Sequence, residues 1–151
     1  MGSDKPLASG RDADVFALGN GRVLRRYRDG SDATAEAELM AYVAGHGFPV
    51  PAVYAVDGAD IEMELLDGST MLDALVAHIL DTRSAAKMLA DLHNTLRAVP
   101  TRTGRNHSDR VIHLDLHPQN VMVTSRGGAP LAAPRFGLVS TDNWAIYSMY
   151  A

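Results

Sequence analysis

A polar turn between two apolar segments, residues 111–123, holds the residue types that this sequence offers for catalysis. His113, Asp115 and Asn120 lie in this turn, with Asn120 five residues after Asp115. A carboxylate can orient a hydroxyl group and take its proton while another group is transferred to that hydroxyl. An amide oxygen nearby is a neutral ligand for a metal ion that carries phosphate groups. The spacing therefore predicts a rigid loop that presents a base and a metal ligand to one reaction.

Two other interpretations of this loop stay open. Asn and Asp are frequent in turns because their side chains hydrogen-bond the neighbouring backbone, so the segment is also typical of a plain β-hairpin. Alternatively, His113, Asp115 and His117 alternate along the chain and meet a metal ion at a strand edge, as in a metal hydrolase. That alternative gives no role to Pro118 or Asn120, and no second carboxylate cluster accompanies it.

The part of the chain before residue 67 predicts a small, mostly antiparallel α+β unit of about five short strands and one helix. Asn20 and Gly21 tolerate positive φ angles, so they predict a tight hairpin turn. Glu36 and Glu38 lie on different faces of the expected helix. One of them can turn toward the sheet and pair with Arg25, and the alternative is that both are solvated surface acids. The clearest strands are expected at residues 15–18, 22–27, 53–56 and 61–66, and the helix at residues 33–44.

The part of the chain after residue 66 predicts two helices, then the polar loop with its flanking strands. A short helix is expected over residues 71–80, and the clearest helix of the chain over residues 84–99, because apolar residues form a stripe along one side of it. Residues 131–139 look irregular, since proline and glycine interrupt them. The stripe consists of Met88, Leu89, Leu92, Leu96 and Val99.

Composition places the chain among packed globular domains. Its 151 residues suit one domain, and 46% hydrophobic and 21% charged residues are near the globular average. A net charge of −4 argues against a nucleic-acid or anionic-membrane partner. The chain has no cysteine, which excludes disulfides and thiolate metal sites. Because the sequence shows neither a membrane-spanning apolar run nor the apolar core of a signal peptide, a cytoplasmic protein is expected.

Four segments of the chain resemble the aminoglycoside phosphotransferase and choline kinase family, a branch of the protein-kinase-like fold. They occur in the order typical of that family, and the resemblance extends over residues 7–124. The form His-x-Asp-x-x-Pro-x-Asn is the most specific of them. The segments are GFPVP at residues 47–51, MELLDG at residues 63–68, ADLH at residues 90–93 and HLDLHPQN at residues 113–120.

The resemblance implies an α+β, protein-kinase-like fold with two lobes. Residues 1–66 would form an antiparallel-sheet lobe with one helix that binds a nucleotide. Residues 67–151 would form a mainly helical second lobe that carries the catalytic loop. Because the family normally adds several helices after this point, the second lobe is expected to be truncated, with the apolar stripe left exposed. Exposed apolar surface drives association, so a homodimer or a domain-swapped assembly is expected.

The resemblance also assigns roles within the loop. Asp115 resembles the catalytic base of the family, His113 the residue that buttresses the loop, and Asn120 a magnesium ligand. The family places a second magnesium ligand, an Asp, at the end of a strand soon after the Asn. The nearest candidate is Asp142, which departs from the pattern because it follows Asn120 by 22 residues.

Arg25 occupies the place of the strand lysine that, in the family, holds the α- and β-phosphates of the nucleotide. Arginine keeps the positive charge, but its planar fork is not equivalent to an ammonium group. Glu36 resembles the helix partner of that lysine.

Two backbone segments complete the implied nucleotide site. The turn at residues 9–14 resembles the loop that covers the phosphates, although it holds one glycine and no repeated-glycine pattern. A later segment resembles the hinge, whose backbone would hydrogen-bond adenine. The candidate residues are Ser9 and Gly10 in the turn, and Met63, Glu64 and Leu66 in the hinge.

The implied activity is that of an ATP-dependent phosphotransferase, with ATP and Mg²⁺ as cofactors. It would transfer the γ-phosphate of ATP to a hydroxyl group of a small molecule of the aminoglycoside or amino-alcohol type. Nucleotide binding is expected, whereas a truncated second lobe would impair turnover. The alternative is a non-catalytic nucleotide-binding or self-associating remnant of the kinase fold.

Overall fold

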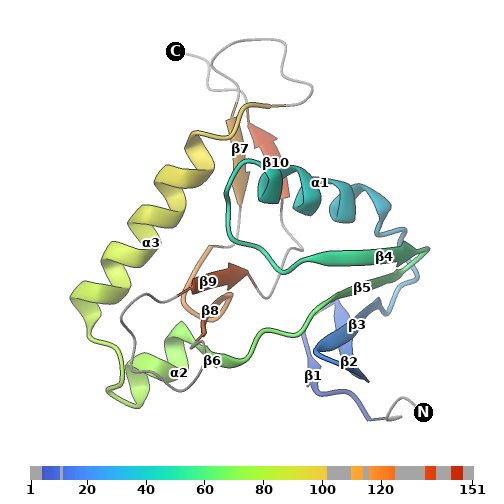
Figure 1. Ribbon diagram of the computed structural model, residues 1–151, viewed down its shortest axis with the longest axis horizontal. Coiled ribbons are helices and arrows are strands. Elements are labelled where there is room, and N and C mark those ends of the chain that lie inside the picture. The colour runs from blue at the N-terminus through green and yellow to red at the C-terminus, as the bar shows by residue number, and fades with distance from the viewer. Residues whose placement is uncertain are drawn as a thin grey trace.

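The computed structural model describes residues 5–10, 12–101, 110–113, 116–124, 135–138 and 144–147. Within them the chain has a mixed α+β fold, as Figure 1 shows. A five-stranded antiparallel sheet and one helix come first, followed by a region in which two helices pack with short strands. The expected α+β class is therefore confirmed.

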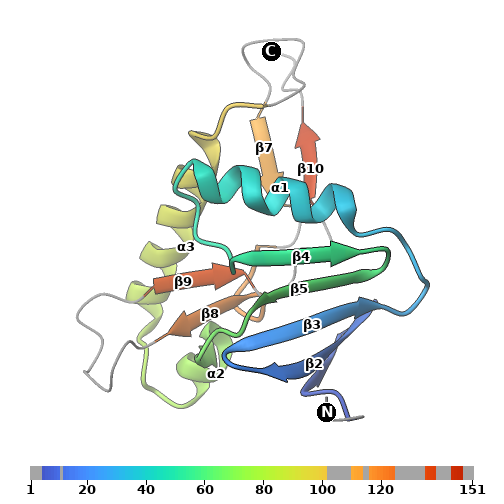
Figure 2. The same ribbon diagram turned by 45° about the vertical axis from the view of Figure 1, so that its right-hand side comes forward.

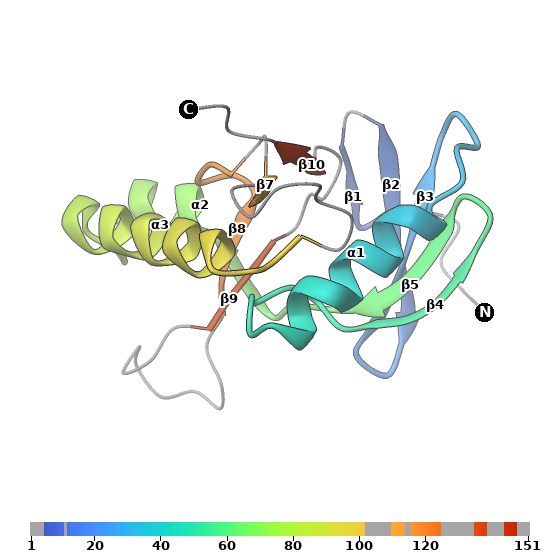
Figure 3. The ribbon, with the colours of Figure 1, turned by 90° about the horizontal axis from the view of Figure 1, so that it is seen from above.

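The first region forms one continuous sheet. Its elements are β1 Ala8–Ser9, β2 Ala13–Gly19, β3 Arg22–Tyr27, α1 Thr34–Gly45, β4 Val53–Asp57 and β5 Asp60–Glu64. The strand order is β1-β2-β3-β5-β4, and every neighbouring pair is antiparallel. Helix α1 lies against the face of the sheet that β3, β5 and β4 present (Figures 2 and 3). The predicted strands and helix of this region are thus confirmed, except that the strand expected over residues 61–66 ends at Glu64.

The turn between β2 and β3 confirms the predicted hairpin. Asn20 and Gly21 have φ angles of 52° and 71°, and these two residues connect the paired Gly19 and Arg22. Positive φ at both central positions gives the turn a twist that matches the flanking strands.

The second region has more strands than the expected, mainly helical lobe. Its elements are β6 Gly68–Thr70, α2 Met71–Val76, α3 Thr82–Arg97, β7 Arg110–His113, β8 Val121–Thr124, β9 Arg135–Leu138 and β10 Trp144–Tyr147. Strands β6, β8 and β9 form one antiparallel sheet, and β7 pairs with β10. The segment that forms β9 was expected to be irregular. That prediction is wrong because residues 135–138 become a strand by pairing with β8.

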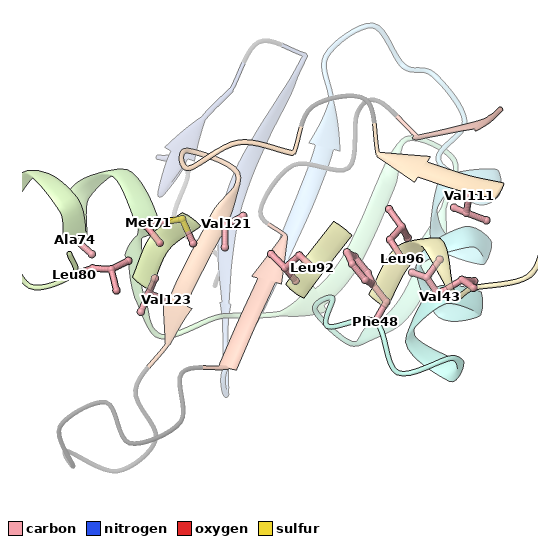
Figure 4. Packing of buried hydrophobic residues seen from close by; sticks show 12 residues of the cluster. Val43, Phe48, Met71, Ala74, Leu80, Leu92, Leu96, Val111, Val121 and Val123 are labelled. Atoms are coloured by element: carbon pink, nitrogen blue, oxygen red, sulfur yellow. The ribbon is translucent and has the colours of Figure 1, made fainter. Parts of the chain in front are cut away.

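Leu92, Leu96 and Val99 of the apolar stripe are buried and Met88 and Leu89 are partly buried against the same core, so the expected exposure of this stripe is wrong. Leu92 and Leu96 pack against the end of α1 and the following loop, where Val43 and Phe48 lie (Figure 4). Val99 belongs to the same buried cluster. Strands β7 and β8 complete this core through their buried valines. A homodimer stays a prediction, but this stripe no longer supports it.

Helix α3 begins earlier than the stripe alone predicts. Asp81 precedes its first turn and accepts hydrogen bonds from the backbone N–H of Ser84 at 2.9 Å and from Ser84 Oγ at 2.6 Å. The N-cap is therefore Asp81, whose carboxylate satisfies an N–H group that has no partner within the helix.

Gly68 allows β6 to approach β8 closely, and we expect Gly68→Ala to lower the free energy of unfolding by about 2–3 kcal/mol. A Cβ atom at this position would overlap the carbonyl oxygen of Val123 and lie 3.0 Å from Cα of Thr124. Neither obstacle is a flexible side-chain end, so the strand pair itself has to move. Urea denaturation measures the effect.

Gly45→Ala is the matched control for that measurement. Gly45 ends α1, and no atom lies within 4 Å of a Cβ built there. Alanine favours a helix more than glycine does, so the control should retain or slightly raise stability. Equal stability of the two variants would show that the close β6–β8 approach does not require glycine.

Candidate functional site

The loop between β7 and β8 is not a hairpin loop, so the plain-hairpin interpretation is wrong. Strand β7 pairs with β10, whereas β8 pairs with β6 and β9. The loop therefore connects strands of two different sheets. In a β-hairpin, a tight turn would instead join two strands that pair with each other.

The strands on either side of Asp142 pair with the strands on either side of this loop. Val121 at the start of β8 faces Leu138 at the end of β9, and His113 at the end of β7 faces Trp144 at the start of β10. Asp115, Asp142 and the side chain of His113 lie outside the described residues. The described strands show that the chain crosses between the same two strand pairs twice, once from β7 to β8 and once from β9 to β10.

Asn120 ends the loop, with its side chain against His117. Asn120 Nδ2 lies 3.2 Å from His117 Nε2, and the Asn120 backbone N–H donates to the carbonyl oxygen of His117 at 2.9 Å. The backbone N–H of Gln119 lies 3.2 Å from His117 Nδ1. The carbonyl oxygen of Pro118 accepts from the N–H of Leu72 in α2 at 3.0 Å. These bonds fix the loop end internally and to α2.

Arg25 and Glu36 meet between the sheet and α1, as their sequence positions suggested. Arg25 Nη1 lies 2.9 Å from Glu36 Oε1, and Arg25 is only 3% exposed. It is the only charged residue buried to this degree in the described part of the chain. A buried charge is costly unless it is paired, so the ion pair explains how a cation can occupy this position. A role toward a nucleotide stays a prediction.

Tyr27 joins this ion pair and was not among the candidate residues predicted from the sequence. Its hydroxyl group hydrogen-bonds Glu36 Oε2, and the guanidinium carbon of Arg25 lies 4.9 Å from the centre of its ring. The signal was available in the sequence. Tyr27 follows Arg25 by two residues on the same strand, and side chains two apart share a face.

The turn that contains Ser9 and Gly10 is held from the end of β3 by Arg28. The Arg28 Nη2 atom donates to the Gly10 carbonyl oxygen at 2.9 Å and to Asp14 Oδ1 at 2.6 Å, while Nε reaches Asp14 Oδ2 at 3.0 Å. The Arg28 backbone N–H also donates to the carbonyl oxygen of Asp12 at 3.0 Å. The turn is therefore tied to the strand that carries Arg25.

The Asp14–Arg28 pair gives a testable pH dependence. The hydrogen bonds that Asp14 accepts from Arg28, together with one from Ser9, lower the pKa of Asp14 to about 2. A lowered pKa in the folded state means that the charged form stabilises the fold at neutral pH. That stabilisation is lost as the pH falls from about 4, the unfolded value, toward about 2. Denaturation at stepped pH should show a smaller acid-induced loss in Asp14→Asn than in wild type, and equal losses would contradict the assignment.

The predicted hinge, residues 63–66, spans the last two residues of β5 and the two that follow. The Glu64 N–H donates to the Ala52 carbonyl oxygen at 2.8 Å, Glu64 Oε2 lies 3.2 Å from the Ala52 nitrogen, and the Leu65 N–H donates to the Gly21 carbonyl oxygen at 2.9 Å. Among the described residues no acceptor is recorded for the N–H of Leu66. Because the Glu64 carboxylate contacts the Ala52 backbone, it stabilises the fold.

The described residues hold neither a membrane-spanning helix nor a preformed metal cluster. No helix in this part of the chain is both long and apolar enough to cross a bilayer. No three acidic, histidine or cysteine side chains within it come together around one point. The trio of the metal-hydrolase alternative falls mostly outside this part, and the His117 ring faces Gln119 and Asn120.

Comparison with known proteins identifies the family. Residues 3–109 match the family model described as "Phosphotransferase enzyme family". The chain is 33% identical over 125 residues to calcium-dependent protein kinase 26 of Oryza sativa subsp. japonica, an alignment covering 78% of this chain and 21% of that protein. It is 31% identical over 111 residues to CDPK-related kinase 4 of Arabidopsis thaliana, covering 71% and 18%.

A third relative is EKC/KEOPS complex subunit BUD32 of Gibberella zeae, 28% identical over 103 residues, with 67% of this chain and 37% of that protein covered. The chain thus spans about a fifth to just over a third of the length of these relatives. The family match covers the sheet, α1, α2 and α3 and ends before the loop at residues 113–120. On this match, the chain belongs to the phosphotransferase enzyme family and has its kinase-like fold.

Proposed function

We propose that the chain is an ATP-dependent phosphotransferase that transfers the γ-phosphate of ATP to a hydroxyl group of a small molecule. The observation that carries the proposal is the buried Arg25–Glu36 ion pair on the α1-facing side of the sheet. A fold has little reason to bury an arginine, because an apolar residue of similar size would cost less to bury. A nucleotide whose phosphates need a fixed cation supplies that reason.

The order of the candidate elements along the sheet suits a nucleotide. Glu64 of the hinge pairs with Arg22 at the start of β3, and Arg25 lies three residues further along that strand. Three residues of a strand span about 10 Å, comparable to the separation of a purine from its α- and β-phosphates. The turn containing Ser9 and Gly10 follows at the far end, because Ala13 pairs with Tyr27. Adenine would lie at the hinge and the phosphates between Arg25 and the turn.

Hydrogen bonding at the hinge fits adenine recognition. The N–H of Leu65 is used within the sheet, whereas that of Leu66 has no recorded acceptor in the described chain. Together with the partly buried setting of Leu66, this favours it as the adenine donor. Met63 is buried beside Ile61 in the core under α1 and would support the base from the sheet side.

The loop between β7 and β8 would supply the chemistry. Asp115 would orient the acceptor hydroxyl and take its proton, and His113 would support the loop backbone. Asn120 and Asp142 would hold Mg²⁺, whose charge would offset that of the phosphates. Carboxylate and amide oxygens suit this ion, and the pairing of β9 and β10 with β8 and β7 favours that ligand set.

The acceptor class rests on the loop sequence. The named protein-kinase relatives share only part of their length with this chain, so their substrates are not carried over. The His-x-Asp-x-x-Pro-x-Asn form instead favours a small acceptor of the aminoglycoside or amino-alcohol type. The alternative is nucleotide binding without turnover, for which the sheet and α1 within the matched residues 3–109 would suffice.

A two-part experiment tests the proposal. Thermal unfolding with and without magnesium-ATP measures binding, since a ligand at a hundred times its Kd stabilises a protein by about 2.7 kcal/mol. A coupled ADP-release assay with aminoglycosides and amino alcohols measures turnover. Stabilisation with turnover supports the enzyme, and stabilisation without turnover supports the binding protein. No response to ATP in either part overturns both.

A further inference from the structure

We propose that Tyr27 is a positioning residue of the nucleotide site, which holds Arg25 in place for the phosphates by fixing both Arg25 and its partner Glu36. The inference rests on the proposed function and deepens it. It starts from the meeting of three side chains, two on β3 and one on α1, in the space between sheet and helix.

The carboxylate of Glu36 is shared between two partners. Arg25 Nη1 contacts Oε1 at 2.9 Å, and the Tyr27 hydroxyl donates to Oε2. A carboxylate held through one oxygen can still rotate about its terminal bond. With each oxygen bonded to a different side chain of the same strand, that rotation is blocked, and α1 is tied to β3 at two points.

The Tyr27 ring acts on Arg25 directly. The guanidinium carbon of Arg25 lies 4.9 Å from the ring centre, within the range of a cation–π contact. Arg25, Glu36 and Tyr27 therefore form a closed triangle in which every pair is in contact. An arginine side chain has many rotamers, and fixing them in advance lowers the entropy that ligand binding would otherwise cost.

Tyr27 is also placed where such fixing matters. It pairs across the sheet with Ala13, which ends the turn proposed to cover the phosphates. The next residue, Arg28, holds that turn. The end of β3 thus fixes both the proposed phosphate-binding arginine and the turn above it.

The opposite face of the sheet contains a comparable set of residues that serves as a control. Arg22 lies 4.2 Å from the ring centre of Tyr54 and contacts Glu62 Oε1 at 2.6 Å. The chemical types match those of Arg25, Tyr27 and Glu36, but Arg22 and Tyr54 are exposed. Changes at Tyr54 therefore report what losing a tyrosine–arginine contact does away from the site.

The test compares the binding of ADP and of adenosine by calorimetry. Tyr27→Phe keeps the ring and removes the hydroxyl group, and Tyr27→Leu removes both. We expect Tyr27→Phe to weaken ADP binding about tenfold, in line with losing a hydrogen bond to a charged group, and Tyr27→Leu to weaken it further. Adenosine, which has no phosphates, should bind each variant as it binds wild type. Tyr54→Phe and Tyr54→Leu should leave both affinities unchanged.

The outcomes separate this inference from the function on which it rests. Equal weakening of ADP and adenosine would show that Tyr27 only maintains the fold, and unchanged ADP binding by Tyr27→Phe would show that Arg25 does not depend on it. Either result overturns the inference while leaving nucleotide binding intact. If wild type binds neither ligand, the proposed function fails together with the inference. Should Tyr27→Leu fail to fold, Tyr27→Phe alone still decides.

Discussion

Replacing Asp115 with Asn is expected to lower kcat about a thousandfold while leaving the affinity for ATP unchanged. Asparagine has nearly the same shape as aspartate, so the loop and its supporting bonds should persist. What it lacks is a carboxylate that accepts a proton from the acceptor hydroxyl. The ADP-release assay, run with the best acceptor of the panel, gives kcat, and calorimetry with magnesium-ATP gives the affinity.

Asp57→Asn provides the control for that experiment. Asp57 ends β4 and is exposed, so its replacement makes the same chemical change away from the loop. Its kcat should equal that of wild type. If Asp115→Asn kept more than a tenth of the wild-type kcat, Asp115 would not be the base, and the loop would act only by binding.

The first region could be predicted from the sequence because its signals are local. The β2–β3 turn requires a backbone conformation that Asn20 and Gly21 accept and few other residues do, which predicts the hairpin and the register of both strands. The alternation along β3 then places Arg25 on the same face as the buried Val23, toward α1. Helical spacing left Glu36 and Glu38 as possible partners of Arg25, and the family resemblance indicated Glu36, which the structure pairs with Arg25.

The second region was harder to predict because its structure depends on partners distant in the chain. The sequence from Gly68 onward is typical of a segment that leaves a sheet, and it becomes a strand only because it pairs with β8. The apolar stripe of α3 revealed that the helix is buried, but not that Val43 and Phe48 cover it. Sequence periodicity identifies the apolar face of a helix and leaves open which element packs against it.

In the candidate site, too, local features could be predicted from the sequence, whereas contacts between distant elements could not. The types and spacing of Asp115 and Asn120 indicated the chemistry, yet the bond between Asn120 and His117 required coordinates. The position of Tyr27 on the same face as Arg25 could be predicted, because side chains two residues apart on a strand share a face. Its hydrogen bond to Glu36, however, depends on how closely α1 approaches β3, which no local pattern specifies.

Arg25→Met is expected to lower the free energy of unfolding by about 3 kcal/mol and to abolish measurable ADP binding. The stability loss comes mainly from Glu36, whose charge would stay buried without its cation. The double variant Arg25→Met/Glu36→Gln removes that stranded charge and keeps an oxygen for Tyr27, so it should recover most of the lost stability. It should not recover ADP binding, because the proposed phosphate-binding cation is still absent.

The difference between recovered stability and unrecovered ADP binding in the double variant distinguishes a structural ion pair from a ligand-binding one. Arg26→Met is the matched control. Arg26 is the next residue along β3, points to the exposed face and pairs with Asp60 at 2.7 and 2.8 Å. Exposed ion pairs contribute little, so this variant should resemble wild type in urea denaturation and in ADP calorimetry. If the double variant regained ADP binding along with its stability, Arg25 would only be a structural cation, and the phosphates would have to be bound elsewhere. If binding stays lost in a protein as stable as wild type, the buried arginine is retained for the nucleotide.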